Sequence, residues 1–188
     1  MSPIEVAATI FGLISVYLTI KENIWCWPTG IIMVVLYIFI FYEVKLYSDM
    51  GLQIFYVFIQ FYGWYHWLYG GKKKDDLPVT KLKKKHIPIW IFVIIVATFA
   101  WGYLMNNYTD AALPYYDAFA VALSVVAQWF LTIKKLESWI LWIIVDVISV
   151  GIYIVKGLNL TAILYVVFLI LAINGLLEWQ KSYRVQKA

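Results

Sequence analysis

The chain has 188 residues, of which 64% are hydrophobic and 14% are charged, and its mean hydropathy is +0.80. Soluble domains have roughly 45–50% apolar and about 25% charged residues, so the composition excludes an ordinary soluble protein and predicts a membrane protein. The formal net charge of +4 arises largely from lysines in residues 70–86, between two apolar stretches. This placement is typical of a membrane-topology signal and predicts no nucleic-acid partner.

Seven apolar stretches follow one another along the chain. Each is close to the ~20 residues with which a helix crosses a hydrocarbon core of about 30 Å. Pro28, Pro88 and Pro114 lie near expected helix starts, where a missing N–H costs nothing. No basic residue precedes the first stretch and no cleavage site follows it, so we expect this span to be retained. The expected spans are residues 4–20, 28–44, 50–68, 87–105, 115–133, 138–155 and 160–178.

The basic residues predict how these spans are oriented. Thirteen of the fifteen Lys and Arg residues fall on one side of a seven-span arrangement, and only Lys45 and Lys156 fall on the other. Because cytoplasmic loops carry the excess of Lys and Arg, we expect the N-terminus outside and the C-terminus in the cytoplasm. The single Cys26 cannot form an intrachain disulfide and is expected to pack.

The chain also resembles itself at a nearly constant spacing in sequence. Residues 18–21 recur as 131–134, Tyr42-x-x-Lys45 as Tyr153-x-x-Lys156, and Gly63-x-x-x-Trp67 as Gly175-x-x-x-Trp179. These matches predict one all-α transport domain over residues 1–188, with repeat one at 4–69, a linker helix at 87–105 and repeat two at 115–179. Because each repeat has three spans, one additional linker helix gives the second repeat the same direction across the membrane as the first. The expected 3+1+3 arrangement of parallel repeats is SWEET-like, with the substrate between the repeats near the midplane.

The sixth span carries one stripe of non-aliphatic residues, at steps of 3, 4, 3 and 4: Trp139, Trp142, Asp146, Ser149 and Tyr153. Asp146 lies ~12 Å inside the span. Facing lipid there would cost an ionised carboxylate at least ~2.5–3.5 kcal/mol, so it should face protein or water. No Lys or Arg lies inside any span to neutralise it. We expect a counter-ion for a cationic substrate that stacks on Trp139 and Trp142; a protonated structural carboxyl is the alternative.

Two other spans carry polar stripes: Gln53, Tyr56, Gln60, Gly63 and Trp67 in the third, and Asp117, Ser124 and Gln128 in the fifth. Polar faces on three helices predict an inward-facing site, although amides between membrane helices also serve as packing contacts. Gly30, Gly63, Gly151 and Gly175 would allow close helix approach.

The sequence contains little that predicts catalysis or a cofactor. His66 and His86 lie too far from other ligands to suggest a metal. The intramembrane serines have no histidine at similar depth, and there is no phosphate-binding GxxxxGK[ST] loop. We therefore expect no catalytic residues, no metal and no cofactor. A membrane scaffold or an intramembrane enzyme remains the competing class.

Four segments carry a family resemblance that covers nearly the whole chain: WCWPTGI (25–31), KLYSDMGLQIFYVFIQFYGWYHW (45–67), SWILWIIVDV (138–147) and GLNLTAILYVVFLILAINGLLEW (157–179). Together they resemble the PnuC family, the bacterial nicotinamide riboside transporters and their vitamin-transporting relatives. The resemblance implies passive uptake through a 3+1+3 fold, commonly as a homotrimer, with intracellular phosphorylation trapping the product.

The resemblance also implies where substrate binds. The Trp-x-x-Trp pair maps to Trp139 and Trp142, and the third span offers Gln53, Tyr56 and Gln60. The seventh span offers Thr161, Tyr165 and Asn174, of which Asn174 lies half a turn from Tyr165. The expected substrate-binding residues are Trp139, Trp142, Asp146, Gln53, Tyr56, Gln60, Gln128, Tyr153, Tyr165 and Asn174.

Family members divide among nicotinamide riboside, thiamine, riboflavin and deoxynucleosides. Asp146 stands where an amide would serve a neutral substrate. A carboxylate beside aromatic rings favours the cationic rings of nicotinamide riboside and thiamine over riboflavin, without separating these two. Nicotinamide riboside is expected as the family's commonest substrate, by analogy, and thiamine is the alternative.

Overall fold

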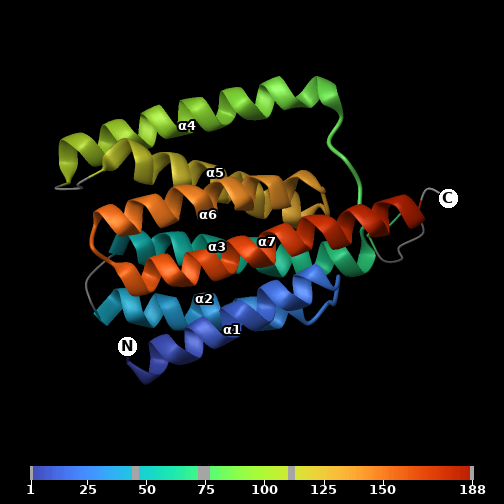
Figure 1. Cartoon of the computed structure of the whole chain (residues 1–188), viewed down its shortest axis with the longest axis horizontal. Helices are drawn as coiled ribbons and strands as arrows, with labels where there is room; N and C mark the ends of the chain where they lie inside the picture. The colour runs from blue at the N-terminus through green and yellow to red at the C-terminus, as the bar shows by residue number, and fades with distance from the viewer. Residues whose placement is uncertain (1, 44–46, 72–76, 110–112, 187–188) are drawn as a thin grey trace. The chain divides into compact units, whose positions relative to one another are not determined.

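The computed structural model describes residues 2–43, 47–71, 77–109 and 113–186, and the regular elements there are helices (Figure 1). In chain order they are α1 (Pro3–Ile20), α2 (Cys26–Glu43), α3 (Tyr47–Tyr69), η1 (Lys84–His86), α4 (Ile87–Tyr108), α5 (Pro114–Thr132), α6 (Glu137–Val155) and α7 (Asn159–Val185). Every predicted span is confirmed as a helix to within a few residues, except that α7 continues to Val185 instead of ending near residue 178. Lys45 and residues 72–74 lie outside the described residues.

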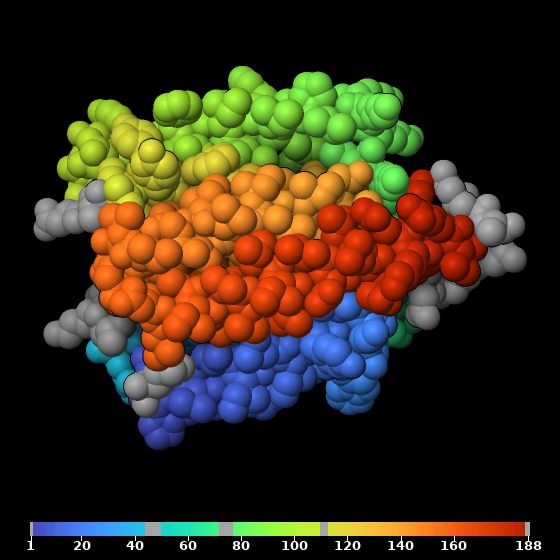
Figure 2. Space-filling view, in the orientation of Figure 1, coloured from blue at the N-terminus to red at the C-terminus, as the bar shows by residue number. Residues whose placement is uncertain are grey.

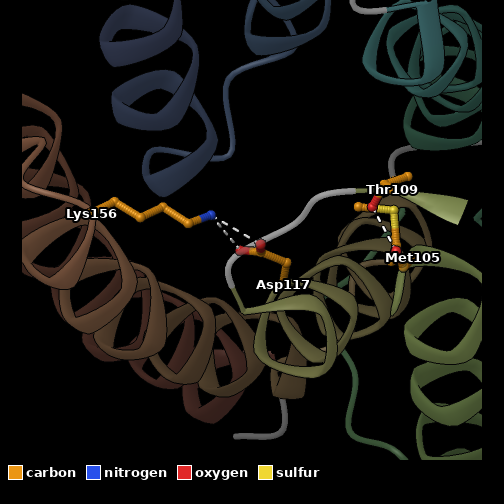
Figure 3. Close-up of polar contacts among 4 residues, drawn as sticks. All are labelled: Met105, Thr109, Asp117 and Lys156. Atoms are coloured by element: carbon orange, nitrogen blue, oxygen red, sulfur yellow. Dashed lines mark hydrogen bonds and ion pairs between the residues drawn. The ribbon is translucent and has the colours of Figure 1, made fainter. Parts of the chain in front are cut away.

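Local chemistry explains where the helices begin and end. Ser2 caps α1 in a capping box: its Oγ accepts the Glu5 N–H at 3.3 Å, and its own N–H donates to the Glu5 carboxylate at 2.6 Å. Pro88 and Pro114 lie in the first turns of α4 and α5, as predicted. At the end of α4, the N–H and the hydroxyl of Thr109 both donate to the Met105 carbonyl, at 3.1 and 2.6 Å (Figure 3).

Five helices of the described chain are long and apolar enough to cross a membrane: α1, α2, α4 with η1, α6 and α7. The other two, α3 and α5, carry the polar stripes predicted above, which lower their hydropathy without shortening them. α4 exposes many large apolar side chains, among them Phe92 and Phe99. A helix apolar on most sides is what a lipid environment requires.

The chain divides into two compact units. The first contains Met1–Pro78 together with Thr132–Lys134, and α2 packs against both α1 and α3 there. The second contains Val79–Leu131 and Lys135–Ala188, in which α6 packs against α7. Figure 2 shows the side chains of α6 and α7 meshing along one face of this unit. Rings join α4 to α5, with Trp90 edge-on to Phe130 at 4.9 Å.

In the first unit a tryptophan pair holds α2 to α3. The Trp27 ring lies edge-on to Trp67, with 5.3 Å between centroids and 87° between planes. Trp27 also lies directly over Gly63, where a Cβ atom would overlap its ring. Gly63 is therefore required for this close approach, as predicted. The Ser15 hydroxyl donates to the Cys26 carbonyl at 2.8 Å and fastens α1 to the start of α2.

The second unit repeats this arrangement at the matching positions of its own sequence. Trp139 lies edge-on to Trp179 at 5.5 Å and 88°, and a Cβ atom on Gly175 would lie 2.6 Å from the Trp139 ring. Gly151 differs from this prediction, because nothing lies within 4 Å of where its Cβ would be. It makes no close helix contact.

Candidate functional site

The predicted stripe lies on the buried face of α6. Trp139 is 2% exposed, Asp146 4% and Ser149 6%, and the Trp142 and Tyr153 side chains are half-buried. The opposite face of α6 is exposed and aliphatic: Ile140, Ile144, Val147 and Ile154. The expectation that Asp146 faces away from lipid is therefore confirmed.

The Asp146 carboxylate has no hydrogen bond or ion pair within the described parts of the chain. A buried carboxylate without a partner is costly, since neither water nor a counter-charge replaces its hydration. Ser149, one turn further along the same buried face, is the nearest polar residue in the stripe. An anion in this position lacks the partner that a purely structural role would require.

Trp139 differs from the expectation of an open stacking surface. Its ring is enclosed by Trp179 and Gly175, so in this conformation it packs α6 against α7. Its indole N–H is buried without an acceptor among the described residues. Of the Trp-x-x-Trp pair, the half-buried Trp142 is thus the ring with surface to offer a ligand.

The other predicted residues of the second unit do not all lie together. Tyr153 and Tyr165 lie together, with 5.1 Å between ring centroids. Gln128 is half-buried on α5 and engaged in a polar interaction. Asn174 is exposed, whereas Thr161 and Tyr165 are half-buried. The structure thus brings the two tyrosines together and leaves Asn174 on a different side of α7, as the half-turn spacing predicted.

In the first unit, Gln60 is the buried member of the α3 stripe, at 7% exposure. Its side-chain amide lies over Gly30, where a Cβ atom would overlap the amide oxygen. Gln53 and Tyr56 are half-buried on the same helix, and Tyr56 has a polar or ring partner. The α3 stripe therefore combines one packed amide with two more accessible polar groups.

Two ion pairs were not predicted from sequence. Lys134 is 6% exposed, donates to the Glu22 carboxylate at 2.8 Å and lies 4.5 Å from the Trp67 ring centroid. Lys156 donates to both carboxylate oxygens of Asp117, at 2.9 and 3.0 Å (Figure 3). The sequence pattern carried no signal for either pair, because the partners are 112 and 39 residues apart along the chain.

Within the described residues, no three His, Cys, Asp or Glu side chains come together as a metal site would require. A family model described as nicotinamide mononucleotide transporter matches residues 2–181. The chain belongs to this transporter family. The predicted family resemblance is thereby confirmed, and a membrane transporter takes the place of the scaffold and enzyme alternatives.

Members of the transporter family with different names match most of the chain. It is 29% identical over 213 residues to the nicotinamide riboside transporter PnuC of Escherichia coli (strain K12), covering 98% of this chain and 87% of that one. It is 25% identical to the riboflavin/roseoflavin transporter RibM of Streptomyces davaonensis, covering 93% and 83%. A crystal structure of the vitamin B3 transporter PnuC superposes with a TM-score of 0.77 at 26% identity, covering 96% and 82%.

Proposed function

We propose that the chain takes up nicotinamide riboside across a bacterial cytoplasmic membrane. The observation that carries this proposal is the buried Asp146 carboxylate, which lacks a counter-charge among the described residues. The pyridinium ring of nicotinamide riboside would supply that charge. Trp142 offers it an aromatic surface, and Tyr153 and Tyr165 a ring pair further along the same helix pair.

The substrate-binding set of this proposal is the predicted one. Its members in the second unit are Asp146, Trp142, Tyr153, Tyr165, Gln128 and, through its unpaired N–H, Trp139. Asn174, which is exposed, is its weakest member. Gln53, Tyr56 and Gln60 of α3 complete it.

The proposed mechanism is alternating access between 3+1+3 parallel repeats, with α4 as the linker. Equal local geometry at matching positions supports the repeats: the Trp27–Trp67 and Trp139–Trp179 pairs have the same edge-on packing. Rocking of one repeat against the other would expose the site to each side in turn. Phosphorylation inside the cell would trap the product.

We further propose an outside N-terminus, a cytoplasmic C-terminus and a homotrimer. The excess of Lys and Arg on one side supports the orientation. The trimer rests on the family resemblance, and the exposed apolar surface of α4 leaves area for a neighbouring copy.

The relatives include transporters named for nicotinamide riboside and for riboflavin, so the choice between these substrates rests on the chemistry of the site residues. Riboflavin has a neutral ring and would not neutralise the charge of a buried carboxylate. Thiamine is the second candidate, because its ring is also cationic. The specific observation behind both is Asp146.

Titration calorimetry on the purified protein with nicotinamide riboside, thiamine, riboflavin and a deoxynucleoside tests the proposal. We expect heat with nicotinamide riboside. Asp146→Asn should weaken its affinity by at least about 30-fold, since losing one partner of a buried charge pair costs about 2–5 kcal/mol. Asp117→Asn is the matched control, because it makes the same change where Lys156 already pairs the carboxylate. Equal binding by the two variants would show that Asp146 is not the counter-ion.

A further inference from the structure

The turns that precede α2 and α6 have the same backbone. Glu22 and Lys134 both have positive φ, at 53° and 48°. The Asn23 N–H donates to the Leu18 carbonyl at 2.9 Å, and the Lys135 N–H donates to the Phe130 carbonyl at 2.8 Å. Their next backbone hydrogen bonds also match, at 3.0 and 3.3 Å in each turn. What covers one turn therefore indicates what the other can bind.

The turn before α6 is covered by an extended segment, residues 79–82. The Leu136 N–H donates to the Thr80 carbonyl at 2.9 Å. In return the Leu82 N–H donates to the Glu137 carboxylate at 2.9 Å, and Lys135 Nζ donates to the Thr80 hydroxyl at 2.8 Å. The turn thus binds amide groups by pairing one backbone N–H with one carboxylate.

The turn before α2 instead borders a cavity of about 360 Å³. Ile24, which matches Leu136 in position, is one of its lining residues, and the Ile24 N–H has no acceptor among the described residues. The lining residues are Glu22, Asn23, Ile24, Trp25, Trp67, Leu68 and Lys134. A volume of this size lies within the range of small-molecule sites, about 300–1,000 Å³.

The cavity also offers a backbone N–H, a carboxylate oxygen and a ring. Its carboxylate comes from Glu22, which matches Lys134 in position, and Trp25 stands where the covered turn has Glu137. Glu22 uses Oε2 to accept from Lys134, and its Oε1 has no partner among the described residues. The Trp25 indole is 64% exposed and provides a flat surface. Lys134 balances the Glu22 charge, so the cavity favours a neutral acceptor–donor group over a free anion.

We propose that this cavity is a second site for a flat ring that bears a primary carboxamide. The carboxamide oxygen accepts the Ile24 N–H, its NH₂ group donates to Glu22, and the ring stacks on Trp25. The choice of a nicotinamide-type ring rests on the proposed function. The proposed orientation places this cavity on the cytoplasmic side. Its lining does not include Asp146 or any other residue of α6. It would hold the transported class of molecule after release.

Thiol protection on the full-length protein tests this site. Cys26, the chain's single cysteine, is 3% exposed and is replaced first by Cys26→Ala. Leu68→Cys then places a reactive thiol on the cavity wall, and its labelling by a maleimide is timed with and without nicotinamide. Nicotinate is the matched ligand, because its carboxylate cannot donate to Glu22.

We expect nicotinamide to slow labelling of the L68C variant and nicotinate to leave the rate unchanged. Adding Trp25→Ala should raise the nicotinamide concentration for half protection by about three- to tenfold, the value of one stacked ring, whereas Trp25→Phe should retain most of the protection. Labelling that nicotinamide leaves unchanged, or equal protection in the W25A variant, overturns the site. Another outcome is labelling that is slow in nanodiscs, faster in detergent and unchanged by nicotinamide. That result would identify a lipid head group in the cavity and would also overturn the carboxamide site.

Uptake of nicotinamide riboside into proteoliposomes separates this inference from the proposed function. Protection without uptake leaves the carboxamide site standing and removes the transport proposal. Uptake without protection does the reverse.

Discussion

The close approach of α6 and α7 can be tested by adding one methyl group. Gly175→Ala would place a Cβ atom 2.6 Å from the Trp139 ring. Trp139 is 2% exposed and Trp179 0%, so neither ring has space to move aside. Inserting a methyl group into such a contact costs typically about 1–3 kcal/mol.

Gly151→Ala is the matched control, because it makes the same change in α6 with nothing within 4 Å. Both variants gain the helix preference of Ala over Gly, about 1 kcal/mol. That gain cancels in the comparison, so their difference isolates the steric cost. For a chain of this size, 1 kcal/mol shifts the melting temperature by about 2–4 °C, so G175A should melt about 2–12 °C below G151A.

Thermal unfolding of the two purified variants at one scan rate measures this difference. Trp139→Phe in the G175A background removes the ring atoms that the methyl group meets and should recover part of the loss, with a coupling of about 0.5–3 kcal/mol. If G175A melts together with G151A, the Trp139–Gly175 contact does not hold the helices together.

Three further changes follow from the ion pairs and the buried anion. Asp146→Leu should raise the melting temperature while abolishing binding of nicotinamide riboside, because an unpaired buried charge costs stability; lower thermal stability would mean that Asp146 has a structural partner. Glu22→Gln should destabilise by up to about 3 kcal/mol by leaving Lys134 buried without its carboxylate, and adding Lys134→Met should recover much of it in the same melting assay. Asp117→Asn should change stability by no more than about 1 kcal/mol, since Lys156 and Asp117 are both partly solvated, and a larger loss in denaturant titration would contradict this.

The helices could be predicted from the sequence because the features that define them are local to each helix. Apolar runs of membrane-spanning length and prolines at helix starts depend only on neighbouring residues. The buried face of α6 could be predicted from the residue spacing, because polar groups facing lipid are costly whereas aliphatic side chains are not. Asp146 therefore lies on the inner face, as expected.

Contacts that join distant residues could not be predicted in this way. Trp139 was expected to present its ring to substrate, yet Gly175 and Trp179 of α7 enclose it. In the sequence, residues 79–82 are only part of a basic segment. In the structure they cover the turn before α6 through one main-chain hydrogen bond and two that involve side chains. Main-chain pairing leaves almost no signature in side-chain composition, so such a segment is visible only in the structure.

The two units have the same helix arrangement but differ in the residues at some matching positions. At matching positions, the first unit has Gly30 and Gln60 where the second has Trp142 and Ala172. In the first unit, the large residue comes from α3 and its amide lies over the glycine. In the second unit, the large residue comes from α6, and Ala172 on α7 is small and buried. The exchange replaces an amide from α3 by an indole from α6. The indole, Trp142, lies one helical turn from Asp146, which has no partner among the described residues, so the two units differ next to the proposed counter-ion.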